Sequence, residues 1–125
     1  MESKKLAHLC RELAENKKAE NIVLLDVRAV SSITDYFVIV TGTSEPHLRA
    51  IMNEIVDQLR DDHGVRPSAS QGGEQASWVV LDYFDVMVHI MRPEARAHYD
   101  LEGLWSDAAK VKTKKKRKPS GRTAN

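Results

Sequence analysis

The chain has 125 residues, enough for one domain with a single hydrophobic core and too few for two. Hydrophobic residues make up 42% and charged residues 30%, as in ordinary globular proteins, and no apolar run approaches the roughly 20 residues that a membrane-spanning helix needs. Because Cys10 is the single cysteine and the first residues carry charges where a signal peptide would be apolar, the sequence predicts a cytoplasmic protein without an internal disulfide.

The net charge of +1 conceals an asymmetry along the chain. Eight basic residues and no acidic ones follow Asp107, whereas residues 1–107 hold 18 acidic and 11 basic residues. We therefore expect a folded domain over residues 1–107 and a basic, disordered tail over residues 108–125. Since affinity for nucleic acid comes mostly from neutralising phosphates, the tail is the part predicted to contact rRNA, and the acidic body is expected to dock through protein contacts. A tail that only aids solubility is the alternative.

Hydrophobic spacing predicts the elements of the first half. Leucines and Cys10 recur at helical intervals, which predicts an amphipathic helix over residues 1–18. The apolar run Ile22–Arg28 predicts a central strand buried on both faces. Tyr36–Thr41, rich in β-branched and aromatic residues, predicts a second strand.

A second helix is predicted after Gly42, with Thr43 or Ser44 as its N-cap and Pro46 in its first turn. Its apolar stripe comprises Leu48, Ile51, Met52, Ile55 and Leu59. Gly64 is well placed to end it in a left-handed conformation.

Short strands dominate the second half of the prediction. Two strands separated by a tight turn predict an antiparallel hairpin, and a proline after the second strand ends it. The predicted elements are an edge strand Val65–Ser68, a loop Ala69–Gln75, the hairpin strands Ser77–Tyr83 and Val86–Met91, and one or two short helices in Glu94–Trp105.

The hairpin strands carry apolar residues on both sides. Alternation places Trp78, Val80 and Asp82 on one face of the first strand and Val79, Leu81 and Tyr83 on the other. Either both faces of the sheet are covered, or one of them is a docking surface. The sequence leaves open whether Trp78 lies in the core or meets a partner.

The segment Thr41–Ser44 is the one arrangement that suggests an enzyme, because a strand-to-helix junction can hold a phosphate. It lacks the lysine of a P-loop and the glycine spacing of a dinucleotide site. Asp82 and Asp85 flank the hairpin turn three residues apart, so they are not expected to converge on metal ions. The five histidines are scattered, and one cysteine cannot support a structural zinc site, which leaves only a metal assembled from residues far apart in the chain. We expect no catalytic residue, metal or cofactor; a nucleotide-binding enzyme or sensor is the alternative.

Six short strings, taken in their order, identify a family resemblance. They are DVR at 26–28, SSITDYFVI at 31–39, TGTS at 41–44, WVVLDY at 78–83, DVMVHI at 85–90 and YDLEGLW at 99–105. From the first helix to residue 105 the chain resembles the Iojap family, also called the ribosomal silencing factors. The resemblance implies an α/β fold, with a single mixed β-sheet packed by helices, like that of nucleotidyltransferases but without their catalytic residues.

The resemblance also implies a function. Members bind the large ribosomal subunit through its ribosomal protein number fourteen, exclude the small subunit and lower translation when nutrients are scarce. The partner-binding surface carried over comprises Trp78, Val80, Asp82, Tyr83, Asp85, His89, Tyr99 and Trp105. Phe84 departs from the pattern, because many members have a small residue at this turn. The sequence leaves open whether the free protein is a homodimer.

Overall fold

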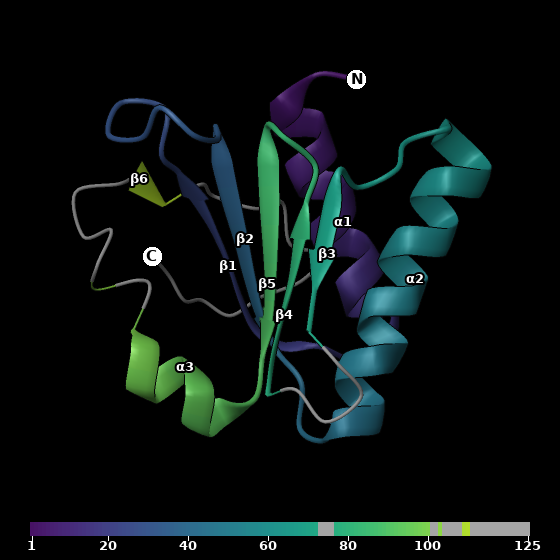
Figure 1. Cartoon of the computed structure of the whole chain (residues 1–125), viewed down its shortest axis with the longest axis vertical. Helices are drawn as coiled ribbons and strands as arrows, with labels where there is room; N and C mark the ends of the chain where they lie inside the picture. The colour runs from purple at the N-terminus through teal and green to yellow at the C-terminus, as the bar shows by residue number, and fades with distance from the viewer. Residues whose placement is uncertain (73–76, 101–102, 104–108, 111–125) are drawn as a thin grey trace, which may run out of the picture.

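A computed structural model describes residues 1–72, 77–100, 103 and 109–110 of the chain. The elements are α1 (Ser3–Asn16), β1 (Glu20–Asp26), β2 (Tyr36–Thr41), α2 (Glu45–His63), β3 (Ala69–Gln71), β4 (Trp78–Asp82), β5 (Val86–Met91), α3 (Pro93–Tyr99) and β6 (Ala109–Lys110). The strands form one sheet in the order β3-β4-β5-β2-β1-β6 (Figure 1). Strands β2 and β5 are parallel and the other neighbours are antiparallel, so the fold is α/β with a single mixed sheet, as the resemblance implies.

The ends of α2 follow from local sequence. The Ser44 hydroxyl accepts a hydrogen bond from the His47 N–H at 3.2 Å, and Pro46 lies in the first turn, where its missing N–H costs nothing. At the other end Gly64 has a φ of 66°, and its N–H donates to the Arg60 carbonyl at 3.0 Å. The predicted helix is confirmed, with Ser44 as its cap.

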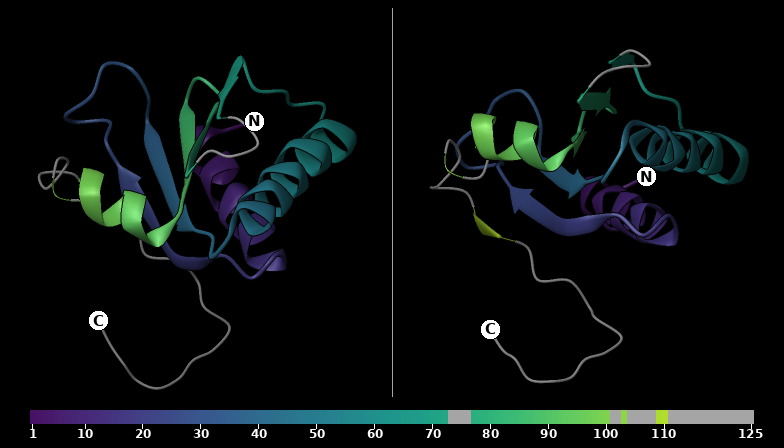
Figure 2. Two further views of the ribbon diagram at one scale, coloured as in Figure 1. Left: turned by 60° about the horizontal axis from the view of Figure 1, so that its bottom comes forward. Right: turned by 90° about the horizontal axis from the view of Figure 1, so that it is seen from below.

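The sheet separates two unequal layers. Helices α1 and α2 cover one face, and α3 lies on the other (Figure 2). The larger core lies between the two long helices and the sheet, and the strand residues that it buries are Leu24 of β1 and residues that alternate along β2, β4 and β5: Tyr36, Val38, Val40, Val79, Leu81, Val86, Val88 and Ile90. The smaller cluster joins Ala95 of α3 to Leu25, Phe37, Ile39 and Met91. The alternation predicted for the first hairpin strand is confirmed.

The single thiol belongs to the larger core. Cys10 is fully buried on α1, and burial raises its pKa to about 12, so it stays protonated at neutral pH. It therefore packs as a small apolar residue.

The structure differs from the sequence-based expectation at two strands. The strand β1 is not central, because it lies between β2 and the two-residue β6. It is nevertheless buried on both faces in its second half, where Leu24 and Leu25 belong to different core clusters. The edge strand is Ala69–Gln71, within the predicted loop, rather than Val65–Ser68, because residues 69–71 are the ones that pair with β4. Both positions depend on pairing between distant segments.

The predicted division into a domain and a tail stays a prediction. The boundary at residue 107 lies outside the described residues, as do residues 111–125 of the expected tail. Just past that boundary, β6 pairs with the end of β1, where Ala109 lies opposite Asp26.

The turn between β4 and β5 places an aromatic residue in an unfavourable backbone conformation. Phe84 has a φ of 69° and is 72% exposed. The Asp82 carboxylate accepts a hydrogen bond from the Phe84 N–H at 2.8 Å, and the Asp85 N–H donates to the Tyr83 carbonyl at 2.8 Å. A residue with a Cβ is strained at positive φ, so glycine would suit this position better than phenylalanine.

We predict that Phe84→Gly stabilises the protein. Glycine relieves a left-handed strain of roughly 1–2 kcal/mol and gives part of it back through a more flexible unfolded chain, for a net gain of about 0.5–1 kcal/mol. Urea unfolding would show a higher midpoint with an unchanged slope. Phe84→Ala is the control, because it removes the ring but keeps the strain, and it should leave the midpoint close to that of the wild type. A lower midpoint for the glycine variant would mean that packing of the ring outweighs the strain.

Candidate functional site

The face of the sheet away from α1 and α2 carries partly exposed side chains of β4. Trp78, Val80 and Asp82 are each half-buried there. They lie opposite residues of β5 in three cross-strand pairs, which are Trp78 with Met91, Val80 with His89 and Asp82 with Met87. Trp78 is therefore neither a fully buried core residue nor a freely exposed one.

Aromatic rings hold Trp78 from two sides. Its indole N–H donates a hydrogen bond to Nδ1 of His89 at 3.0 Å, and the two ring centroids lie 5.7 Å apart. The Tyr99 ring, at the end of α3, lies 4.6 Å from the indole centroid to centroid and is 52% exposed. The three rings thus form one cluster where β4 begins and β5 ends.

His89 is the buried member of this cluster. Its side chain is only 6% exposed, and its ring meets that of Phe37 edge-on at 5.1 Å. Burial lowers the pKa of His89 to about 4, so the imidazole is neutral at pH 7. The imidazole therefore reaches the partly exposed surface only through its hydrogen bond with Trp78.

The other predicted site residues are separated by the fold. Tyr83 is 5% exposed in the core under α1 and α2, on the opposite face of the sheet, so a partner cannot contact it in this conformation. Asp82 and Asp85 lie at the hairpin turn, at the far end of β4 from Trp78. The Asp85 carbonyl there accepts hydrogen bonds from the N–H groups of Asp35 and Tyr36, at 3.0 and 3.1 Å. Trp105 lies outside the described residues.

Sequence reasoning missed two residues that shape this face. Met87 is half-buried on this face and lies opposite Asp82. The alternation of side chains along β5 could have identified it. Arg96 of α3 donates a hydrogen bond to the Thr41 hydroxyl at 2.8 Å, which ties α3, and with it Tyr99, to the end of β2. No sequence pattern links two residues that are 55 positions apart.

The strand-to-helix junction after β2 uses its polar groups internally. The Thr43 N–H donates to Nδ1 of His47 at 2.9 Å, and the His47 N–H donates to Ser44. Because Nδ1 accepts, the neutral ring carries its proton on Nε2, which donates to the Lys17 carbonyl at 2.6 Å. A Cβ on Gly42 would lie 2.8 Å from Cδ2 of Leu48, so glycine permits the close approach of strand and helix. Two backbone amides that a phosphate would need are thus already occupied.

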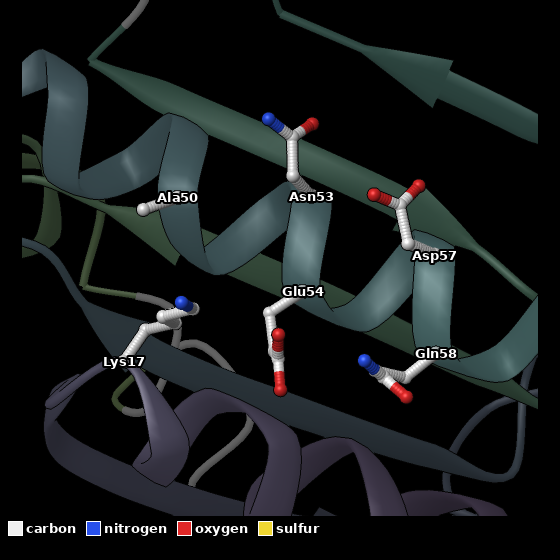
Figure 3. Close-up of a pocket in the computed structure, with 6 residues that line it drawn as sticks. All are labelled: Lys17, Ala50, Asn53, Glu54, Asp57 and Gln58. Atoms are coloured by element: carbon white, nitrogen blue, oxygen red, sulfur yellow. The ribbon is translucent and has the colours of Figure 1, made fainter.

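A polar hollow lies between α2 and the residue that follows α1 (Figure 3). It is lined by Lys17, Ala50, Asn53, Glu54, Asp57 and Gln58. The Glu54 carboxylate accepts a hydrogen bond from the Asn16 side chain at 3.1 Å, which links α2 to the end of α1. Nothing in this lining pairs a nucleophile with a base.

The described part of the chain lacks two kinds of feature. Among those residues, no group of three or more histidine, cysteine, aspartate or glutamate side chains is arranged to hold a metal ion. No helix among them is both long and apolar enough to cross a membrane.

Comparisons with known proteins agree on one family. All 125 residues match the family model described as "Ribosomal silencing factor during starvation". The chain is 37% identical over 108 residues to the ribosomal silencing factor RsfS of Bacillus subtilis, covering 86% of this chain and 91% of that protein. It is 33% identical over 99 residues to the mouse protein named mitochondrial assembly of ribosomal large subunit protein 1, covering 75% and 42%. A crystal structure of a Chromobacterium violaceum protein matches with a TM-score of 0.81 at 32% identity, covering 96% and 92%.

We predict that His89 makes stability depend on pH. Its folded pKa of about 4 lies below the ordinary value of 6.5, so the unfolded chain takes up a proton between these values and the folded chain does not. The folded protein therefore becomes less stable as the pH falls through this window. The free energy of unfolding decreases by about 2 kcal/mol between pH 7.5 and pH 5.

Other groups also titrate in that range, so the free energy of unfolding of the wild type must be compared with that of a variant without the histidine. Urea unfolding of the wild type and of His89→Leu, at several pH values, should give a difference in free energy that changes by about 2 kcal/mol in favour of the variant as the pH falls. A difference that stays constant would mean that His89 is protonated as readily in the folded state as in the unfolded chain.

Proposed function

The chain belongs to the ribosomal silencing factor family, and we propose that it binds the large ribosomal subunit through large-subunit ribosomal protein number fourteen. Docking there places the protein where the small subunit would join, so joining is blocked by steric exclusion and translation is repressed when nutrients are limited. The protein acts in the cytoplasm as a binding factor and catalyses no reaction.

The partly exposed Trp78 is the single observation that carries the proposal for the binding surface. Interfaces draw most of their energy from a few large anchors, and tryptophan is among the commonest of them. Its neighbours Val80 and Tyr99 are also accessible on this face. A partly exposed aromatic group that neighbouring rings support is suited to contact with a pocket of a partner protein.

Charge favours a basic partner over a nucleic acid at this face. Asp82 and Asp85 lie at the hairpin turn, and the N–H of a third acidic residue, Asp35, donates a hydrogen bond to the Asp85 carbonyl. This acidic end would repel rRNA phosphates and attract a ribosomal protein, whose surface must be basic to lie among those phosphates.

The predicted site residues take two different parts in this proposal. Direct contacts come from Trp78, Val80, Asp82, Asp85 and Tyr99, and Trp105 is proposed to extend them. His89 and Tyr83 act from within the fold, because both are buried. The basic residues after Asp107 are proposed to add contacts with rRNA that weaken as salt is raised.

A nucleotide-binding role is the weaker candidate. The junction that could have held a phosphate donates the N–H groups of Thr43 and His47 to groups of the chain itself. A phosphate would have to break these hydrogen bonds before it gained its own.

The proposal predicts the behaviour of purified ribosomal subunits on a sucrose gradient. The protein in excess should sediment with the large subunit and not with the small one, and it should lower the yield of joined particles. The order of addition matters, since steric exclusion acts best when the factor meets the large subunit first. Equal yields of joined ribosomes with and without the protein would contradict the proposal.

A second prediction concerns Trp78→Ala. Removing a true anchor weakens binding to the isolated ribosomal protein by roughly 30- to 1000-fold. Because Trp78 is only half-buried, the loss of stability should fall short of the roughly 3–5 kcal/mol of a fully buried tryptophan. Val79→Ala is the matched control: it empties core space on the other face of the same strand, so it should lower stability and spare binding. Binding that survives in folded Trp78→Ala protein would remove this residue from the interface.

A further inference from the structure

The hydrogen bond between Trp78 and His89 determines the state of the histidine. An indole nitrogen can only donate, so Nδ1 of His89, 3.0 Å from it, must carry no proton. The neutral ring therefore holds its proton on Nε2. Protonation of Nδ1 would place its N–H opposite the indole N–H of Trp78, and the hydrogen bond between the two rings would be lost.

Keeping a histidine here costs stability. Its Nε2 is buried and has no hydrogen-bond partner in the part of the chain that the structure describes. A buried N–H without a partner is unfavourable, whereas an apolar side chain could fill the same space without that cost. The neighbours of His89 across the strands on either side are Ile39 and Val80, both apolar. The hydrogen bond to Trp78 is what the histidine adds to this position.

The surroundings leave the imidazole little freedom. His89 is 6% exposed, and the Phe37 ring packs against it at 83°. The hydrogen bond therefore joins a partly exposed indole to a group that is fixed in the sheet. On the outer side the indole meets Tyr99 of α3, and the Arg96 hydrogen bond to Thr41 ties that helix to the sheet.

We propose that His89 is a positioning residue, which holds the Trp78 indole in one orientation before a partner arrives. The inference rests on the proposed function, because it assigns to Trp78 the role of anchor. An anchor that is already oriented loses less conformational freedom on binding than one that must be ordered. His89 thus raises the affinity without touching the partner.

Two variants separate the hydrogen bond from the packing. His89→Leu fills a similar volume without an acceptor, whereas His89→Asn places an amide oxygen near the position of Nδ1. Exchange of the Trp78 indole proton with solvent, followed by NMR with Trp78→Phe for assignment, reports the hydrogen bond without any partner. Affinity for large ribosomal subunits reports its consequence.

We expect His89→Leu to speed exchange of the Trp78 indole proton and to weaken subunit binding by roughly 3- to 10-fold. His89→Asn should restore much of both. Val88→Ala is the control for stability, because Val88 precedes His89 on β5 but is buried on the opposite face; it should change neither exchange nor affinity.

Two results would overturn the proposal. One is an indole proton that exchanges as slowly in His89→Leu as in the wild type, because the histidine then does not hold it. The other is faster exchange with unchanged affinity, because the orientation then does not matter for binding. If the wild-type protein does not bind large subunits at all, the proposed function fails by itself, and the exchange rates still decide whether His89 holds Trp78.

Discussion

The parallel ladder between β2 and β5 joins residues 36–41 to residues 86–91, and the arrangement of the candidate site depends on it. Parallel strands cannot be joined by a tight turn, so α2, β3 and β4 lie in the connection between them. In this register Val88 faces α1 and α2, and His89 lies on the other face of the sheet. Trp78 of the neighbouring strand β4 lies beside His89 there. A register shift of one residue in β5 would exchange these faces and remove the support of the indole.

The two faces of the sheet are specialised by the helices that cover them. Two long helices close one face over a large apolar core, and the seven-residue α3 covers only part of the other. A short cover leaves room for half-buried side chains such as Trp78, Val80 and Met87. That incomplete burial costs some hydrophobic stabilisation, which the proposed partner would restore by covering the same face.

The junction after β2 has the strand–turn–helix form of a phosphate site, but the N–H groups of Thr43 and His47 are hydrogen-bonded within the chain. Gly42 allows the strand and the helix to approach closely, and Ser44 caps the helix. His47 then accepts from the Thr43 N–H and donates to the Lys17 carbonyl, so the junction is tied to the end of α1. The strand–turn–helix pattern is therefore explained by packing and capping, and it needs no ligand.

The sequence by itself determined the elements whose signals are local. Periodicity placed α1 and α2, and β-branched and aromatic content placed β2. Thr43 or Ser44 marked the start of α2, Gly64 marked its end, and alternation assigned the two faces of β4. Only the tertiary structure decided which segment forms the edge strand, that Tyr83 is buried under the helices, and that His89 supports Trp78. These outcomes rest on contacts between residues far apart in the chain, and no local pattern specifies which distant segment a strand will pair with or which side chain will meet an indole.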